Sequence, residues 1–426
     1  MGLRERERDP ELPALAGQAH LRPPSVDELL ELAGAHLLRP DAPALTGGRW
    51  DYARWKPGVS ITSVYTVRFA DGVEEPVVAK RYVDGKERTL TFRPQGEEQL
   101  EELCVRLKPR AVLAERALSL WVPPADRVVR GLPVLLDRKK LGNLVTRAGI
   151  APSGAVKKRK TAYTLLRYKP ERRAVYRLDL RLRSEEQPRL TLAARALPAA
   201  EAGRVIGART ALEAAGGREL APPIAATNLR QGFLLEPWLA LENPAPDTFA
   251  HASAAGAELA RLHALAPPPD LRLVSTGLPP DLDELFAVEP ALVRLPRARP
   301  HPAPERLVFC HGDFHPDQVV KRADGRWILM DLDLLGAGDP AFDLACWAAD
   351  WIIESERVDL AAATDSLLDG YRSAGGSPPP MTRLTAFTAA ELVCRAGSTL
   401  RRLEKGALAK ARFALEAARQ VGREAT

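Results

Sequence analysis

Apolar and polar residues alternate along two separate stretches of the chain. In the first, the alternating runs 61–69 and 76–82 stand on either side of an Asp-Gly turn. In the second, residues 174–182 and 189–197 alternate in the same way across a polar turn. Alternation with period two, interrupted by turn residues, is typical of antiparallel strands. The pattern therefore predicts two strand-rich units in the first half of the chain.

In the second half, apolar positions recur three and four residues apart, which is the period of an amphipathic helix. Helices are expected over 250–264, 282–288, 342–356, 358–375 and 381–420. The strand-rich units also have helical segments beside them, which are expected over 26–38, 96–107 and 199–215. Strands gathered in the first half and helices in the second indicate an α+β fold.

The two strand-rich units share a short motif. Arg54 to Pro57 reads RWKP and Arg167 to Pro170 reads RYKP, and an alternating strand follows each of them. The position of this motif, more than any long identity, indicates an internal repeat of one strand-and-helix unit.

One stretch near the C-terminal third carries the clearest chemistry. Residues 311–318 read HGDFHPDQ, and a predicted hairpin with an Asp-Gly turn leads from them to Asp331. Because such a tight turn returns the chain to where it left, we expect Asp331 beside Gln318 and near the loop that carries Asp313.

Two carboxylates and an amide oxygen that meet in one cleft suit the transfer of a phosphoryl group. This reaction needs a positioned acceptor, a group that takes its proton, and a metal ion that neutralises charge. Asp313 is the candidate base, while Gln318 and Asp331 offer the hard oxygen ligands that Mg²⁺ prefers. Asp333 is a further candidate ligand.

Three segments of this region, HGDFHPDQ at 311–318, ILMDLD at 328–333 and GAGDPAFDLA at 336–345, resemble the aminoglycoside phosphotransferase and choline kinase family in order and spacing. That family is similar in fold to protein kinases. The resemblance implies two lobes, with a small antiparallel β-sheet in the N-lobe and a mainly helical C-lobe. It also implies ATP as phosphate donor, Mg²⁺ as cofactor and a small-molecule hydroxyl as acceptor, with Asp313 as the catalytic residue.

The resemblance divides the chain into three parts. Residues 151–238 would form the kinase-like N-lobe, and residues 239–426 the helical C-lobe with the catalytic loop. Residues 1–150 hold the first copy of the repeat. They would form a cap that resembles a duplicated N-lobe, much as maltokinase-like enzymes carry an extra N-terminal unit.

The resemblance also implies a nucleotide site. Glu236 and Trp238 lie in a segment that resembles the hinge whose backbone holds the adenine. Arg195 stands where the family has a lysine that reaches the nucleotide phosphates. A carboxylate of the following helix is expected to hold this cation, and Glu201 and Glu213 are both open as that carboxylate.

The first copy of the repeat has the family-like lysine, Lys80, in the sequence VVAK. No helical lobe of its own follows this copy. Lys80 is therefore expected to be a solvated strand residue.

Two residues depart from the family pattern. The family usually has an asparagine five residues after the catalytic aspartate, where this chain has Gln318, and Arg195 stands in place of the lysine. Glutamine offers the same amide oxygen on a longer stem, and arginine still pairs with phosphate, although its planar fork differs from an ammonium group. The alternative function is therefore a pseudokinase that binds a nucleotide and regulates a partner without turnover.

A zinc site is the alternative interpretation of the same loop. Cys310, His311 and His315 carry zinc-ligating atoms, and the two histidines are four residues apart as on a metalloprotease helix. Gly312 and Pro316 argue against a helix there, so the phosphotransferase interpretation is preferred.

Three further residues of this half are expected to be structural. Asp339 precedes a proline, which is typical of a helix N-cap, and Asp343 is interpreted in the same way. The segment that holds both resembles one that braces the catalytic loop in the family. His263 belongs to a Leu-His pair that resembles the family's residues packed under that loop, where a hydrogen-bonded role is expected.

Composition excludes several classes of protein. The 426 residues are 46% hydrophobic and 27% charged, which is ordinary for a globular chain of two or three domains. No uncharged apolar stretch reaches about 18 residues, the length of a membrane span, and the charged N-terminus lacks a signal sequence. We therefore expect no membrane partner and a cytoplasmic location. The four cysteines show no paired spacing, which argues against a disulfide framework.

The formal net charge of +6 does not indicate a nucleic-acid partner. The basic runs 157–160 and 167–173 contain few aromatic residues and match no nucleic-acid motif, and nucleotide phosphates explain part of the charge. The basic residues of the last helix are expected on a solvated face: Arg401, Arg402, Lys405, Lys410 and Arg412.

The acceptor stays open among an aminoglycoside, a sugar, a choline-like amine and another metabolite hydroxyl. Its contacts are expected in the proline-rich segment 265–304 and in the last helices. No motif in the chain indicates an oligomeric state.

Overall fold

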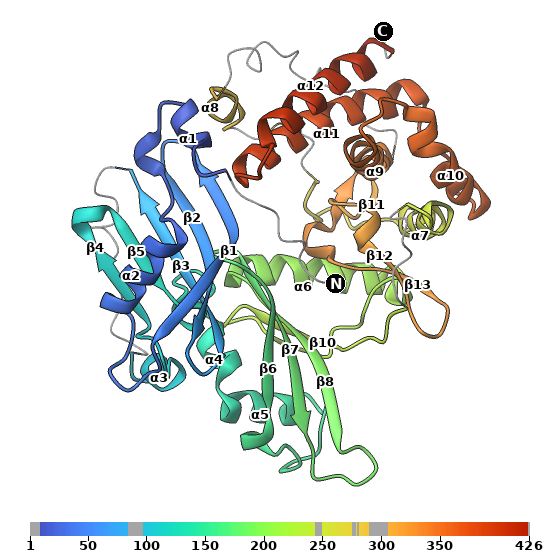
Figure 1. The fold of residues 1–426 in the computed structure, drawn as a ribbon. Helices are drawn as coiled ribbons and strands as arrows, with labels where there is room; N and C mark the ends of the chain where they lie inside the picture. Colours follow the sequence, from blue (N-terminus) through green and yellow to red (C-terminus); the bar gives the residue numbers. More distant parts are fainter. Residues whose placement is uncertain are drawn as a thin grey trace.

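The computed structural model describes residues 9–83, 97–242, 249–274, 278, 281–288 and 306–424. Two antiparallel five-stranded sheets are followed by a mainly helical lobe (Figure 1), which confirms the predicted α+β fold with a sheet-based N-lobe and a helical C-lobe. The first sheet consists of β1 (Leu45–Lys56), β2 (Ser60–Phe69), β3 (Glu74–Tyr82), β4 (Arg110–Leu113) and β5 (Leu118–Trp121). The second consists of β6 (Ala162–Lys169), β7 (Arg173–Arg181), β8 (Arg189–Ala196), β9 (Ala226–Asn228) and β10 (Phe233–Pro237).

The two sheets have the same strand order, β1-β2-β3-β5-β4 and β6-β7-β8-β10-β9. Their registers also correspond at the RxKP motif. Arg54 is linked through one facing residue of β2 to Lys80, and Arg167 is linked through one facing residue of β7 to Arg195. Lys80 and Arg195 therefore occupy equivalent positions, and the repeat inferred from the RxKP motif extends to the whole sheet.

Helices cover both sheets. The first sheet packs against α2 (Val26–His36), which Ser25 caps by accepting a hydrogen bond from the backbone of Glu28. The inward face of β7 and β8 shares one core with α4 (Leu132–Leu136) and α5 (Arg138–Arg147) and with Trp121 of the first sheet. The first unit is thus packed directly onto the back of the second sheet.

The helical lobe follows α6 (Ala199–Ala214), which packs on β10 on one side and on the lobe on the other. Its helices are α7 (Ala252–Ala264), α8 (Leu282–Phe286), α9 (Pro340–Ser355), α10 (Leu360–Ser373), α11 (Met381–Arg401) and α12 (Ala407–Glu424). Two small ladders lie within it, β11 (Val308–Cys310) with β14 (Gly336–Gly338), and β12 (Val319–Lys321) with β13 (Trp327–Leu329). The shorter helices α1 (Leu12–Leu15) and α3 (Glu97–Leu103) belong to the first unit.

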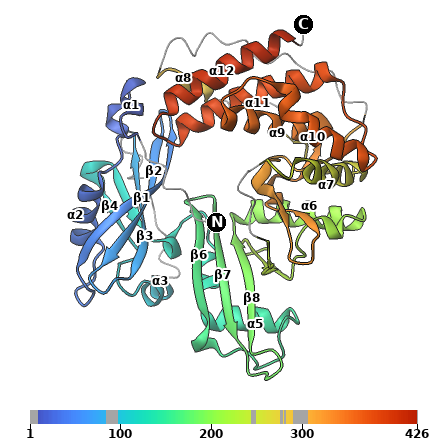
Figure 2. The same cartoon turned by 45° about the vertical axis from the view of Figure 1, so that its right-hand side comes forward.

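The first unit also reaches the helical lobe. Trp55 and Ile61, at the adjacent ends of β1 and β2, are buried in one apolar core with Leu392 and Leu400 of α11 and Ala411 of α12. Figure 2 shows the two sheets side by side beneath the long helices α11 and α12. The first unit therefore contacts both the second sheet and the helical lobe.

Three predicted elements differ from the structure. The helix expected over 381–420 is two helices, because Leu403 and Gly406 have left-handed backbone angles and Leu403 is buried at the corner between them. The helix expected over 96–107 ends at Leu103, and Leu107 is held instead in a bridge to Leu38. The helix expected over 26–38 ends at His36, because Leu38 takes part in that bridge.

Candidate active site

The hairpin that follows the loop 311–318 places Gln318 next to Asp331. β12 and β13 pair with Val319 opposite Leu329, and the next rung joins the Met330 backbone N–H to the Gln318 backbone oxygen at 2.8 Å. Asp331 follows Met330 directly, so the predicted proximity of Asp331 and Gln318 is confirmed. Asp331 itself has a left-handed backbone with φ of 54°.

Asp343 of α9 holds the loop from beneath. Its carboxylate accepts hydrogen bonds from the backbone N–H groups of His311, at 2.7 Å, and Gly312, at 2.9 Å. It also lies 3.1 Å from Nε2 of His263, whose Nδ1 lies 2.9 Å from the Tyr371 hydroxyl. The structural role expected for His263 is confirmed. The capping role expected for Asp343 is wrong, because both carboxylate oxygens face the loop and not its own helix.

Asp339 behaves as predicted and caps α9 by accepting a hydrogen bond from the Ala341 backbone N–H at 2.8 Å. Gly312 is required by its surroundings. It has φ of 85°, and a Cβ added there would lie 2.5 Å from the backbone oxygen of Leu334. The braced loop and its glycine therefore fix where Asp313 stands.

The Asp313 side chain is 48% exposed and faces α11. Its carboxylate lies 3.9 Å from Nη2 of Arg395, which also pairs with Asp350 at 2.8 Å and with Glu391 at 2.9 Å. Desolvation acts to raise the pKa of Asp313, but the charges of Arg395, His315 and His311 outweigh it and lower that pKa. The group is therefore ionised at neutral pH and open to a substrate.

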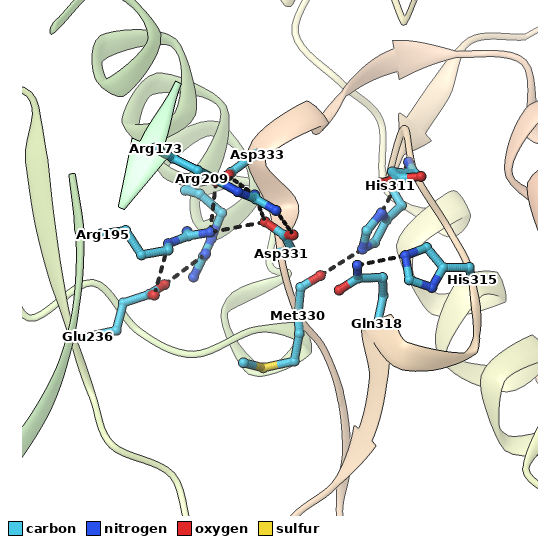
Figure 3. Close-up of polar contacts among 11 residues, drawn as sticks. Arg173, Arg195, Arg209, Glu236, His311, His315, Gln318, Met330, Asp331 and Asp333 are labelled. Atoms are coloured by element: carbon cyan, nitrogen blue, oxygen red, sulfur yellow. Dashed lines mark hydrogen bonds and ion pairs between the residues drawn. The ribbon is translucent and has the colours of Figure 1, made fainter. Parts of the chain in front are cut away.

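Gln318 is 7% exposed, and its amide nitrogen lies 2.9 Å from Nε2 of His315. Burial lowers the pKa of His315, so the neutral ring accepts this hydrogen bond. The amide oxygen of Gln318 then points away from His315, as Figure 3 shows.

Asp331 is clamped by an arginine that the sequence did not single out. Both guanidinium nitrogens of Arg173 bind the two carboxylate oxygens of Asp331, at 2.6 and 2.8 Å, and Nη1 also binds Asp333 at 2.6 Å. Desolvation would raise the pKa of Asp331, but Arg173 above all, and then Arg195, hold it well below its ordinary value. Two-pronged pairs of this kind are the strong form of a charged hydrogen bond.

Arg195 lies in the same network (Figure 3). Its Nη1 binds Asp333 at 2.7 Å, and its Nε lies 3.3 Å from Glu236, which in turn lies 3.3 Å from Arg209 of α6. Three arginines thus face three carboxylates, those of Asp331, Asp333 and Glu236, and the network is neutral as a whole.

The carboxylate partner expected from α6 is not found. Among the described residues, neither Glu201 nor Glu213 forms an ion pair with Arg195. Glu236 takes this place because it is the diagonal neighbour of Arg195 across the β8–β10 ladder, a separation that long side chains can bridge. Helix α6 contributes a cation, Arg209, instead of an anion.

Trp238 lies outside this network. It is 40% exposed, its backbone N–H donates to the Thr191 oxygen at 3.2 Å, and the guanidinium of Arg177 stacks over its ring at 5.0 Å. Of the three residues predicted to hold the nucleotide, the fold therefore brings together Arg195 and Glu236, and leaves Trp238 on the rim.

Lys80, the counterpart of Arg195 in the first sheet, is 7% exposed and bound to Glu171. The prediction that it is solvated is wrong. Glu171 lies in the turn between β6 and β7, where it also pairs with Arg127 at 3.0 Å and donates its backbone N–H to Asp126 at 2.8 Å. The first unit thus holds the β6–β7 turn of the second.

The zinc interpretation finds no support in the geometry. Nε2 of His311 lies 2.8 Å from the Met330 backbone oxygen, and that of His315 is taken by Gln318. Among the described residues, the one cluster with metal-ligand spacing is a different one, His263, Cys310 and Asp343. Its histidine and carboxylate already hold the loop, and burial raises the pKa of the Cys310 thiol.

Two further expectations are settled only in part. Most of the segment 265–304, where acceptor contacts are expected, lies outside the described residues. The predicted solvated face of the last helix is wrong at Arg401, which pairs with Asp281.

In the part of the chain that the structure describes, no helix is both long and apolar enough to cross a membrane.

A family model, described as the phosphotransferase enzyme family, matches residues 164–387, just over half of the chain. The chain belongs to this family of small-molecule phosphotransferases, whose acceptor is a hydroxyl group. The matched region contains nearly all of the second sheet and the loop with Asp313, Gln318 and Asp331, whereas Arg395 lies beyond it. A comparison with curated protein sequences finds no match.

Several solved structures are similar to part of the chain. Macrolide 2′-phosphotransferase MphH from Brachybacterium faecium is 16% identical, covers 67% of this chain and 97% of its own, and has a TM-score of 0.39. Choline kinase LicA from Streptococcus pneumoniae, which has also been solved with AMP, is 13% identical over 66% of this chain and 99% of its own, with a TM-score of 0.41. An ethanolamine kinase from Plasmodium vivax is 9% identical over 67% and 90% of the two chains, with a TM-score of 0.47.

Proposed function

We propose that this chain is an ATP- and Mg²⁺-dependent kinase that transfers the γ-phosphate to a hydroxyl of a small molecule. One observation carries the proposal. The loop with Asp313 and the strand end with Asp331 and Asp333 lie together opposite two arginines of the second sheet, Arg173 and Arg195. A proton acceptor, oxygen ligands and phosphate-binding cations are the parts that phosphoryl transfer requires.

The chemistry assigned to the chain is simple. Asp313 takes the proton of the acceptor hydroxyl as the hydroxyl oxygen forms a bond to the γ-phosphorus. The bond between that phosphorus and the bridging oxygen breaks, and ADP leaves with the electron pair. The lowered pKa of Asp313 keeps the carboxylate ionised, so that it can receive the proton.

The residues present fit a magnesium ion. The amide oxygen of Gln318 and the carboxylates of Asp331 and Asp333 are hard oxygen donors on one wall of the site, and Mg²⁺ takes a few such ligands together with phosphate oxygens. Bound there, the ion would neutralise charge on the phosphates. Asp331 is already paired with Arg173, so these two cations would share its carboxylate.

The nucleotide phosphates would lie against Arg195 and Arg173, with the base near the segment of Glu236 and Trp238. Glu236 supports this assignment through its side chain, which orients Arg195. The acceptor would be a small hydroxylated molecule. An enzyme that draws on cellular ATP would work in the cytoplasm.

The test compares two variants of one loop. Asp313→Ala should lower kcat for ADP formation by roughly 10²- to 10⁴-fold, because the acceptor proton has nowhere to go. Asp317→Ala, an exposed position in the same loop, should leave it within about twofold. Both are assayed with Mg²⁺ against pooled sugars, amino alcohols, aminoglycosides and phosphorylated polyols. Equal rates in wild type and Asp313→Ala would contradict the role of Asp313.

A second function has one observation in its favour. Arg173 engages both oxygens of Asp331, an arrangement that would also suit a pseudokinase which binds a nucleotide without metal-dependent turnover. ATP-dependent thermal stabilisation, with no Mg²⁺-dependent turnover of any pool, would favour this function over the kinase.

A further inference from the structure

A group of basic side chains lies outside the neutral network of the active site. Arg54 comes from β1, Arg167 and Lys169 from β6, and Arg172 from the β6–β7 turn. We call these four residues the basic cluster. Among the described residues, none of the four side chains has a hydrogen bond or an ion pair. They are distributed between half-buried (Arg54, Lys169) and exposed (Arg167, Arg172) positions.

The side chains of the basic cluster carry like charges that repel one another. Lys169 lies directly opposite Arg173 in the β6–β7 ladder, a like-charge pairing that destabilises a sheet. Burial lowers the pKa of Lys169 to about 6, with further contributions from Arg173, Arg167, Arg172 and Arg402. Several positive side chains brought together without an ion-pair partner lower the stability of the folded protein.

The cluster gathers groups from three parts of the molecule. Lys80 of the first sheet binds Glu171 in the β6–β7 turn, so the first sheet lies next to that turn. Burial, and then the charge of Arg172 in the same turn, lower the pKa of Arg54. Arg401 and Arg402, at the end of α11, contribute to the electrostatic surroundings of Arg54 and Lys169. Helix α11 also contacts β1 directly.

The cluster also lies close to the site of transfer. Among the negative charges that act on Arg167, that of Asp331 has the largest effect on its pKa. Along α11, Arg402 follows Arg395 by seven residues, which is about 10 Å at the rise of an α-helix, and Arg395 lies 3.9 Å from Asp313. An acceptor of about this length, with its hydroxyl at Asp313, would reach the surroundings of Arg402, whose charge also acts on Lys169 of the basic cluster.

The phosphates of the donor do not account for all these charges. Arg173 and Arg195 already face Asp331 and Asp333, where the donor phosphates are proposed to lie. Arg54 belongs to the first unit, outside the sheet proposed to hold the nucleotide. Near Asp313, Arg395 pairs with the carboxylates of Asp350 and Glu391 and gives that wall of the site a cation of its own.

Building on the proposed kinase function, we propose that the basic cluster binds an anionic group, a phosphate or a carboxylate, of the acceptor whose hydroxyl lies at Asp313. The acceptor is then an acidic polyol. A polycationic aminoglycoside is disfavoured, because its ammonium groups would approach unpaired arginines. An anion placed among these residues would remove the repulsion and return the proton to Lys169.

The first experiment uses acceptors matched in shape and different in charge: ribose and ribose 5-phosphate, glucose and gluconate, and kanamycin. Wild type should show a kcat/KM at least tenfold higher for an acidic member than for its neutral partner, and lowest for kanamycin. The comparison of ribose 5-phosphate with gluconate shows whether the preferred anionic group is a phosphate or a carboxylate. A preference for the neutral members or for kanamycin would overturn the proposal.

The second experiment uses variants. Lys169→Gln and Arg54→Gln should each raise KM for the acidic acceptor by about tenfold and leave KM for ATP within twofold. Lys56→Gln is the matched control, since Lys56 is the exposed equivalent of Lys169 in the first sheet, and it should change neither. An increase in KM for ATP alone would assign the cluster to the donor and overturn the proposal.

A binding experiment separates this proposal from the kinase function. Calorimetry with Asp313→Asn, in the presence of Mg²⁺ and a non-hydrolysable ATP analogue, measures binding of ribose 5-phosphate and gluconate without turnover. Binding at pH 7.5 should take up close to one proton, seen as a dependence of the heat on the buffer, and Lys169→Gln should abolish that uptake. If wild type transfers no phosphate to any acceptor, the proposed kinase function is wrong. This measurement still shows whether the basic cluster binds an anion. If neither anion binds, the proposal that the basic cluster is an anion site is wrong.

Discussion

The two sheets of this protein have one topology and two uses. Lys80 in β3 and Arg195 in β8 occupy equivalent positions in equivalent registers. Arg195 faces the carboxylates of Asp333 and Glu236, whereas Lys80 faces Glu171 in the turn of the other sheet. The comparison teaches that the strand position supplies a cation, while the partner that the fold brings opposite decides what the cation does.

The open ends of the sheets differ in the same way. In the first sheet, Trp55 is fully buried against α11 and α12, so the helical lobe fills the space beside its RWKP motif. In the second, the RYKP motif carries Lys169 into the basic cluster near Asp331. We propose that residues 1–150 are a duplicated lobe that holds the β6–β7 turn of the working lobe and binds no nucleotide.

Substitution of Arg195 should have the largest effect on this contrast. Arg195→Met removes a cation proposed to meet the donor phosphates and leaves Asp333 and Glu236 short of a partner, so kcat/KM for ATP should fall by roughly 10²- to 10³-fold. Arg195→Lys should keep part of the wild-type kcat/KM for ATP. The measurement is steady-state ADP formation at saturating acceptor. Equal activity of Arg195→Met and wild type would remove Arg195 from the site.

Substitution of Lys80 should act on stability more than on chemistry. Lys80→Met leaves Glu171 without its buried partner, which should lower the free energy of unfolding by about 3 kcal/mol and raise KM for ATP less than tenfold. Denaturant unfolding and steady-state kinetics measure the two effects.

The double variant Lys80→Met/Glu171→Met is the control, and it should recover much of the lost stability. If Lys80→Met lowered kcat/KM for ATP as far as Arg195→Met does, the two sheets would not differ in use.

The smallest effect concerns the pH dependence of stability. Lys169 has a pKa of about 6 in the folded protein and about 10.4 in an unfolded chain. Between these values the unfolded chain binds the additional proton, so this group makes stability rise with pH. Lys169→Gln should raise Tm by roughly 1–3 °C at pH 6, and the gain should shrink toward pH 9.

Thermal unfolding of wild type, Lys169→Gln and Lys56→Gln at pH 6, 7.5 and 9 measures this effect. Lys56→Gln should follow wild type at every pH, because that side chain is exposed in the first sheet. Parallel curves for wild type and Lys169→Gln would show that Lys169 is not titrating between pH 6 and 9.

Much of the site was predictable from the sequence because its signals are local. The Asp-Gly turn between β12 and β13 requires that Asp331 return to Gln318, and the register bears this out. The RxKP motif indicates the repeat from the sequence alone, without strand pairing. Helix signals were less complete, because the corner depends on the burial of Leu403 as well as on the local signal of Gly406.

The partners of charged residues were not predictable. Arg173 ends the basic run 167–173, which matches no nucleic-acid motif and indicates no partner, yet it binds Asp331, which is 158 residues further along the chain. Arg395 resembled any other basic residue of α11, yet it lies beside Asp313. For Arg173, the like-charge position opposite Lys169 at the end of a predicted strand was the one available signal.

The sequence by itself determined the α+β architecture, the repeat, the family and the loop that carries Asp313, because periodicity, turns and short motifs act between residues close in the chain. The tertiary structure alone decided that Glu236 pairs with Arg195, that Lys80 holds Glu171, and that Asp343 supports the loop. Coulomb energy and hydrogen bonding depend on distance in space, and only the packing of the two sheets and the helical lobe sets those distances.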